Sequence, residues 1–159
     1  MNKLKRLEIL KFIIGKHSEP TVTSLMKIAY LADLLALKKG HTISDYEYVR
    51  YYYGPFDKRI YSDIDELVSG GYVQADPKFS GTGDGGEYFV FKPTNKLADE
   101  SPTLLDAKEQ ELLTSLLDDI RGYGAKTLTE AAYQTKPMKK LGATLGGNEH
   151  LHTPLDLNA

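Results

Sequence analysis

The residues that could do chemistry in this sequence are a glycine-rich run, a pair of histidines and several neighbouring carboxylates. Residues 81–86 have the glycine spacing of a phosphate-binding loop. Such a loop must lead into a helix whose N-terminal amides meet the phosphates, whereas a strand-like segment follows here, so we interpret it as a hairpin tip. His150 and His152 lie two residues apart near Glu149, and no third ligand stands out. Solvated side chains explain them better than a metal site does.

The carboxylates do not form a recognisable catalytic set. Most lie on predicted helices with an apolar opposite face and one pair lies in a polar connector: Asp63/Asp65/Glu66, Asp118/Asp119 and Asp99/Glu100. No serine, histidine and aspartate occur in the context of a nucleophile elbow. The lack of cysteine excludes a thiolate nucleophile, a disulfide scaffold and a cysteine-ligated zinc site. We therefore expect no enzyme activity, no metal and no cofactor.

Tyrosine is the unusual feature of the composition. Six of the 11 tyrosines lie between residues 46 and 61, and three are consecutive at 51–53. Because side chains alternate between the two faces of a strand, one strand cannot bury three consecutive rings on one side. Two interpretations stay open. The rings lie at the rim of an amphipathic sheet with their hydroxyls in water, or they are exposed aromatic anchors at a protein interface.

Length and charge narrow the class of protein further. A chain of 159 residues with 41% apolar residues suits one globular domain with its own core. A net charge of −2 argues against a dedicated nucleic-acid binder. No run approaches the roughly 18 apolar residues that cross a bilayer, and Glu8 and Lys11 interrupt the N-terminal apolar stretch, which makes a poor signal peptide. We therefore expect a cytoplasmic protein with no membrane contact.

The charge is distributed unevenly. Residues 1–39 carry eight basic and three acidic side chains, a net charge of +5, and the remainder of the chain is acidic. Such a distribution suits a charged protein partner or self-association into a homodimer. Two ordinary helices with solvated lysine faces are the simpler explanation of this distribution.

Periodicity predicts a mainly α (α+β) fold: a helical domain with a small antiparallel β-sheet or hairpin, winged-helix-like in order. The predicted helices are 3–16, 23–39, 55–69, 106–121, 127–133 and 137–141, and the predicted strands are 47–53, 72–75 and 87–92. We expect one domain over 1–141 and a flexible C-terminal tail over 142–159, because the tail is rich in Gly, Asn, His and Pro.

Two segments anchor this prediction. The helix 23–39 is apolar on nearly every side, which is typical of a central, buried helix. Asp33 lies inside this apolar run, so it must be paired or lie at a rim. The Gly54-Pro55 pair is expected to end the tyrosine-rich strand and to place Pro55 at the first turn of the next helix.

Two sequence motifs in this order resemble a known family. Leu25-Met26-Lys27-Ile28-Ala29-Tyr30-Leu31-Ala32-Asp33 is followed about twenty residues later by Tyr52-Tyr53-Gly54-Pro55-Phe56. This pattern resembles the Panacea domain, also called the SocA-like antitoxin domain, over roughly residues 5–140. The resemblance implies a mostly helical domain with a small β element, found in antitoxins of bacterial and phage two-gene systems, that neutralises toxins by direct protein contact without enzyme activity.

The resemblance also assigns residues. Those matching the family motif, which we expect to be mainly structural, are Lys27, Tyr30, Asp33, Gly54 and Pro55. We further expect Asp33 to accept hydrogen bonds from backbone amides near the Gly54 turn. The side chains that we expect to contact the partner toxin are Tyr48, Arg50, Tyr51, Tyr52, Tyr53 and Arg59.

Two alternatives stay open. Some family members act as proteolytic adaptors for their toxin. A winged-helix-like DNA-binding regulator would read DNA with the helix 55–69, which carries Lys58 and Arg59 but also four carboxylates that phosphates would repel.

Overall fold

The computed structural model describes residues 2–79, 86–101 and 104–159. Its helices and strands, in chain order, are α1 (Lys3–Lys16), α2 (Val22–Leu37), β1 (Val49–Tyr51), β2 (Gly54–Phe56), α3 (Arg59–Ser69), β3 (Val73–Phe79), β4 (Glu87–Pro93), α4 (Asn95–Ala98), α5 (Ala107–Asp119), α6 (Ala125–Tyr133) and α7 (Lys136–Leu141). The described chain is thus mainly helical with two small antiparallel sheets, which confirms the predicted fold class.

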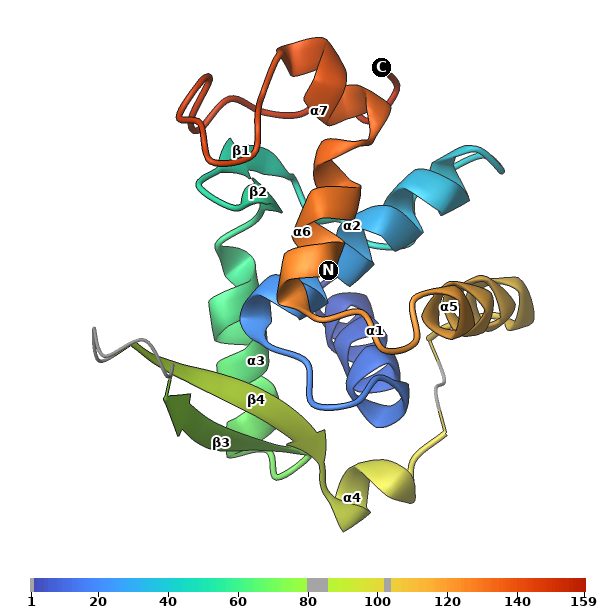
Figure 1. Cartoon of the computed structure of the whole chain (residues 1–159). Helices are drawn as coiled ribbons and strands as arrows, with labels where there is room; N and C mark the ends of the chain where they lie inside the picture. The colour runs from blue at the N-terminus through green and yellow to red at the C-terminus, as the bar shows by residue number, and fades with distance from the viewer. Residues whose placement is uncertain (1, 80–85, 102–103) are drawn as a thin grey trace.

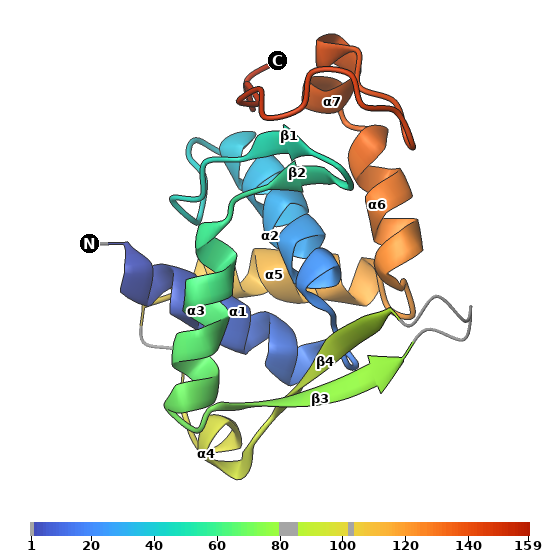
Figure 2. The same ribbon diagram turned by 90° about the vertical axis from the view of Figure 1, so that its left-hand side faces the viewer.

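Helix α2 is the centre of the molecule, as its sequence predicts. It packs against α1, α3, α5, α6 and β2, which surround it in both ribbon views (Figures 1 and 2). Leu25, Met26 and Ile28 on this helix are fully buried in the main hydrophobic cluster. The Thr21 hydroxyl caps the helix by accepting a hydrogen bond from the amide of Ser24.

The tyrosine-rich segment forms a hairpin, and the predicted role of Gly54-Pro55 is wrong. Gly54–Phe56 is the second strand of this hairpin, paired with Val49–Tyr51, and α3 begins only at Arg59. Tyr52 and Tyr53 form the turn, and Gly54 follows it with a φ of 103° that glycine adopts without strain. The chain therefore reverses at the tyrosines before it enters the helix.

The second sheet is a longer hairpin that follows α3, in the order that the winged-helix-like prediction requires. Its register runs from Val73 opposite Pro93 to Phe79 opposite Glu87, so both strands extend beyond their predicted limits. The predicted glycine-rich tip lies largely outside the described residues. Helix α4, where the sequence predicts only a connector, begins with a Thr94 cap that accepts a hydrogen bond from the Leu97 amide.

Helix α5 begins with a capping box: the side chains of Asp106 and Glu109 each accept a hydrogen bond from the backbone amide of the other residue. Helix α6 begins at Ala125 with Gly124 as its cap, two residues before the predicted start at Thr127. No helix in the described ranges combines the length and apolar character that a membrane crossing demands.

The C-terminal segment, residues 142–159, is predicted as a flexible tail but lies against β1 (Figure 2). The Arg50 amide donates to the Thr153 carbonyl at 2.8 Å, and the Leu155 amide donates to the Tyr48 carbonyl at 2.9 Å. Leu155 also packs against the core. Backbone hydrogen bonds and apolar contacts, neither visible in the composition of the segment, account for this packing.

Candidate functional site

Lys27 of α2 binds the second strand of the first hairpin. Its side-chain Nζ donates a hydrogen bond to the carbonyl of Pro55 at 3.0 Å, and the side chain is almost completely buried. A Cβ added at Gly54 would lie 3.4 Å from both the Lys27 stem and the Tyr133 ring, and it would need the positive φ that only glycine accepts cheaply. These contacts join Lys27 of α2 to the strand that contains Gly54 and Pro55.

Asp33 organises the loop between α2 and β1. Its carboxylate accepts hydrogen bonds from the amides of Ile43 and Ser44 at 2.8 and 2.9 Å, from the Ser44 hydroxyl at 2.5 Å and from the Tyr48 hydroxyl at 2.7 Å. Burial raises the pKa of Asp33, and these hydrogen bonds oppose that rise.

The expectation that Asp33 binds amides near Gly54 is therefore wrong. Asp33 lies six residues beyond Lys27, roughly 9 Å further along the helix axis. At that position along α2, Asp33 binds the loop at residues 43–44, whereas Lys27 binds the strand that follows the Gly54 turn.

Tyr30 joins α2 to the junction between α6 and α7. Its ring is fully buried, and its hydroxyl lies 2.7 Å from the Thr135 hydroxyl. The ring also meets Tyr48 edge to face, with the centroids 5.2 Å apart. The side chains of Lys27, Tyr30 and Asp33 thus bind three separate segments around one helix.

Two residues expected to contact a partner are inside the protein. Tyr48 is only 3% exposed, and its hydroxyl donates a hydrogen bond to the buried Asp33. Arg50 is 0% exposed, because the C-terminal segment wraps its guanidinium with the carbonyls of Thr144, Gly147 and Glu149. Both residues are structural in this conformation, which corrects the prediction.

The remaining tyrosines of the hairpin are accessible. Tyr52 is 50% exposed and Tyr53 is 67% exposed, both at the turn. Tyr51 is half-buried and packs against Tyr52 on one side and Phe56 on the other, with centroids 5.0 and 5.2 Å apart. Phe56 in turn meets Tyr61 of α3 at 5.5 Å. We call these five residues the tyrosine ridge.

The sequence interpretation misses Phe56 and Tyr61 as partner-contacting residues and places Phe56 within the predicted helix 55–69. The strand pairing places Phe56 opposite Val49, and this register puts its ring beside Tyr51 and within reach of α3. The density of aromatic residues over positions 46–61 is the signal that could have identified both residues.

A hollow of about 620 Å³ adjoins the tyrosine ridge. Tyr51, Phe56 and Tyr61 line it together with Lys58, Arg59 and His152, besides acidic and apolar neighbours. Such a mixture of aromatic and charged side chains is typical of protein interfaces.

Arg59 is half-buried at the edge of this hollow. Its guanidinium forms two short contacts with Asp57, at 2.7 and 3.0 Å, and donates to the carbonyl of Asp45 at 2.7 Å. Burial raises the pKa of Asp57, but the hydrogen bonds from Arg59 outweigh it and the pKa is lowered. Arg59 therefore holds the base of the hairpin as well as carrying charge at the surface.

A buried ion pair fixes α3 to α1. Two nitrogens of Arg6 meet the Asp63 carboxylate at 2.8 and 3.2 Å, and a third meets Asp45 at 2.8 Å. The Tyr46 hydroxyl donates to the same Asp63 carboxylate at 2.8 Å. Asp63 is almost fully buried, so its charge depends on these partners.

The chain matches the model of one known protein family. The model described as "Antitoxin SocA-like, Panacea domain" matches residues 25–137, more than two thirds of the sequence. The chain belongs to this family. No curated protein and no solved structure gives a match.

The matched range of the Panacea domain contains the tyrosine ridge and the α2 residues that support it. Helix α1 and the C-terminal segment lie outside that range. Within the described residues, no three histidines, aspartates or glutamates are grouped in a way that could hold a metal ion.

The buried lysine of the Panacea domain makes stability depend on pH. Burial lowers the pKa of Lys27 from 10.5 to about 7, so between these values the unfolded chain binds a proton that the folded chain does not. Stability must therefore rise with pH in this window. We expect the free energy of unfolding to increase by about 2 kcal/mol between pH 7 and pH 9.

Urea denaturation at several pH values measures this increase. Lys27→Met keeps much of the side-chain volume without the titrating group, so its stability should stay nearly flat over the same window. Parallel pH profiles for the two proteins would exclude Lys27 as the source.

Proposed function

We propose that this protein is an antitoxin that neutralises its cognate protein toxin in the cytoplasm by direct, stoichiometric binding through the tyrosine ridge. The observation that carries the proposal is the exposure of neighbouring aromatic rings on a hairpin whose base is fixed by buried polar contacts. Membership of the Panacea antitoxin family supports the class of partner.

The support under the ridge suits tight binding. Lys27 holds β2 from the side of α2, and the C-terminal segment pairs with β1 on the other side. A hairpin that is ordered before binding loses little conformational entropy when a partner arrives. Tyrosine rings add large contact area with few rotatable bonds, which is why they recur among the residues that dominate binding energy.

The surface charges favour a protein partner over DNA. Asp65 and Glu66 are exposed on α3, the helix that would read DNA in a winged-helix arrangement. Phosphates would repel them. The ridge itself is flanked by both signs of charge, with Lys58 and Arg59 near Glu47 and Asp57.

The test uses the product of the gene adjacent to this one. We expect that product to be toxic when expressed alone, harmless when co-expressed with this protein, and retained in a complex with it. The double variant Tyr52→Ala/Tyr53→Ala should weaken the complex by about 2–3 kcal/mol, measured by isothermal titration calorimetry, because it removes the two exposed rings at the hairpin turn.

The matched control is Tyr88→Ala/Tyr123→Ala, which removes two exposed rings outside the ridge. It should leave the affinity unchanged. Equal weakening by both double variants would contradict the ridge as the binding surface, and an adjacent product that is neither toxic nor bound would contradict the antitoxin function.

A further inference from the structure

Helix α2 has more apolar surface than the protein itself covers. Its sequence is that of a helix buried on all sides, yet Leu31, Leu34 and Leu37 are only half-buried and Leu35 is 39% exposed. All four belong to the C-terminal half of the helix, where Ala32 and Ala36 on the same helix remain buried in the core. Contiguous apolar surface of this kind on a folded protein commonly marks an interaction site.

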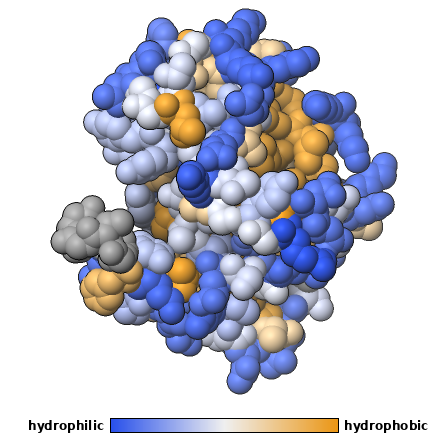
Figure 3. All heavy atoms as spheres, in the orientation of Figure 1, coloured by the Kyte–Doolittle hydropathy of each residue, from blue (hydrophilic) through white to orange (hydrophobic). Residues whose placement is uncertain are grey.

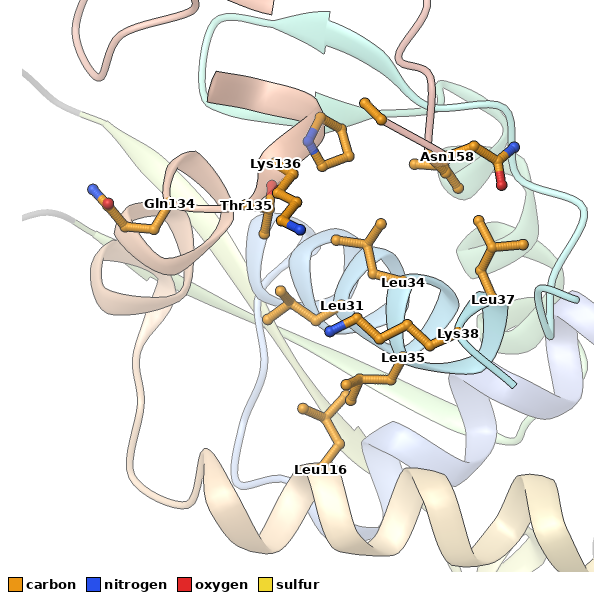
Figure 4. A pocket seen from close by; sticks show the side chains of 13 residues that line it. Leu31, Leu34, Leu35, Leu37, Lys38, Leu116, Gln134, Thr135, Lys136 and Asn158 are labelled. Atoms are coloured by element: carbon orange, nitrogen blue, oxygen red, sulfur yellow. The ribbon is translucent and has the colours of Figure 1, made fainter. Parts of the chain in front are cut away.

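These leucines form one wall of a groove of about 650 Å³ (Figure 4). Leu116 of α5 closes one side, and Thr135, Lys136 and Pro137 at the start of α7 form the opposite side. Figure 3 shows a large apolar area bordered by hydrophilic side chains on this part of the surface. The groove is separate from the hollow beside the tyrosine ridge, because no residue lines both.

The charged side chains at the edge of the groove are positive. Lys38 ends α2 on one side and Lys136 begins α7 on the other, and both are exposed. In the part of the chain that the structure describes, neither ammonium group has a carboxylate partner, and no Asp or Glu side chain lines the groove. An occupant with carboxylates beside its apolar side chains would complete both interactions.

The protein's own chain shows which side chains the groove accepts. Leu157 of the C-terminal segment lines it and packs against the core, in the sequence Leu155-Asp156-Leu157. This segment has apolar residues alternating with an acid. It fills only part of the groove, since Leu35 stays exposed.

We propose that this groove is a second docking site for the toxin and that it binds an apolar segment flanked by Asp or Glu. The proposal rests on the proposed antitoxin function and adds the chemistry of the partner. Leucine-like side chains of the segment lie on Leu31, Leu34 and Leu35, and its carboxylates face Lys38 and Lys136. The ridge and the groove then contact the toxin at two separate places.

Two fluorescein-labelled amphipathic peptides test the chemistry directly. Both have leucines at i, i+3, i+4 and i+7; one has glutamate at the other positions and the other has lysine. Fluorescence anisotropy with the full-length protein should show that the glutamate peptide binds about tenfold more tightly, because it gains two exposed charge pairs. Equal affinities, or no binding by either peptide, would overturn the proposal.

Substitutions in the groove locate the site. Leu35→Glu places a charge on the groove at an exposed helix position, and Lys136→Glu reverses one edge charge. Each substitution should lower the affinity of the protein for the glutamate peptide by about tenfold or more. The matched controls Leu4→Glu and Lys126→Glu alter an exposed leucine and an exposed lysine elsewhere, and their affinity for the peptide should equal that of the wild type.

The complex with the adjacent gene product separates this proposal from the proposed function. If the wild type binds that product and Leu35→Glu binds it equally well, the groove proposal fails while the antitoxin function stands. If the wild type does not bind it at all, the antitoxin function fails and the toxin fails as the occupant of the groove, while the peptide result still tests separately whether the groove prefers an acidic apolar segment. Light scattering that shows a wild-type dimer and a Leu35→Glu monomer would assign the groove to a second copy of this chain and overturn the toxin as its occupant.

Discussion

Replacing Asp33 by alanine is expected to lower the free energy of unfolding by about 3–5 kcal/mol. The substitution removes the acceptor of four hydrogen bonds inside the protein: those from the Ile43 and Ser44 amides and from the Ser44 and Tyr48 hydroxyls. Water cannot replace the carboxylate easily, because Asp33 and Tyr48 are both almost completely buried. Each donor left without a partner costs about 1–3 kcal/mol.

Urea denaturation followed by circular dichroism measures this loss. Asp33→Asn keeps one acceptor oxygen at the same place, so it should be less destabilised than the alanine variant. Asp65→Ala, an exposed aspartate on α3, is the matched control and should change stability by less than about 0.5 kcal/mol. A loss for Asp33→Ala no larger than that of the control would show that the loop at residues 43–44 does not depend on the carboxylate.

Asp33 illustrates what the sequence alone can establish. A single carboxylate in an apolar helix must be paired, and this inference needs only local pattern and the cost of burying charge. The limits of α1 and α2 follow for the same reason, since apolar periodicity is local. The identity of the donors does not follow, because it depends on how the loop at residues 43–44 returns to α2.

Arg50 illustrates the opposite case. Its type and its place among tyrosines predict an exposed interface residue, but three carbonyls from residues 144–149 surround its guanidinium. Nothing near Arg50 in the sequence encodes that contact, which joins positions almost 100 residues apart. The exposure of Tyr52 and Tyr53, in contrast, follows from their place in the turn of a hairpin.

Removing the charge of Arg6 is expected to destabilise the protein by about 3–5 kcal/mol. Arg6→Met keeps an apolar stem of similar length but leaves the Asp63 carboxylate buried with the Tyr46 hydroxyl as its main donor. An ionised carboxylate in that position would no longer have a cation to compensate for its lost hydration. Lys3→Ala, measured in the same way, should lower the free energy of unfolding by less than about 1 kcal/mol, because the ion pair between Lys3 and Glu66 is exposed.

The double variant Arg6→Met/Asp63→Leu separates the cost of an unpaired charge from the contribution of the pair. Removing both charges leaves no buried ion, so the double variant should recover most of the stability that Arg6→Met loses, and a double-mutant cycle gives the coupling energy. No recovery would mean that packing of the Arg6 stem, and not its charge, holds α3.

The outcome also bears on the extent of the folding unit. Arg6 belongs to α1, outside the range matched by the Panacea family model, whereas Asp63 and Tyr61 of the ridge belong to α3 inside it. A large coupling energy would mean that α1 determines the position of α3 and therefore of the exposed ring that α3 contributes to the ridge. Arg6→Met should then bind the adjacent gene product more weakly than Lys3→Ala does, even though both variants keep every residue of the ridge.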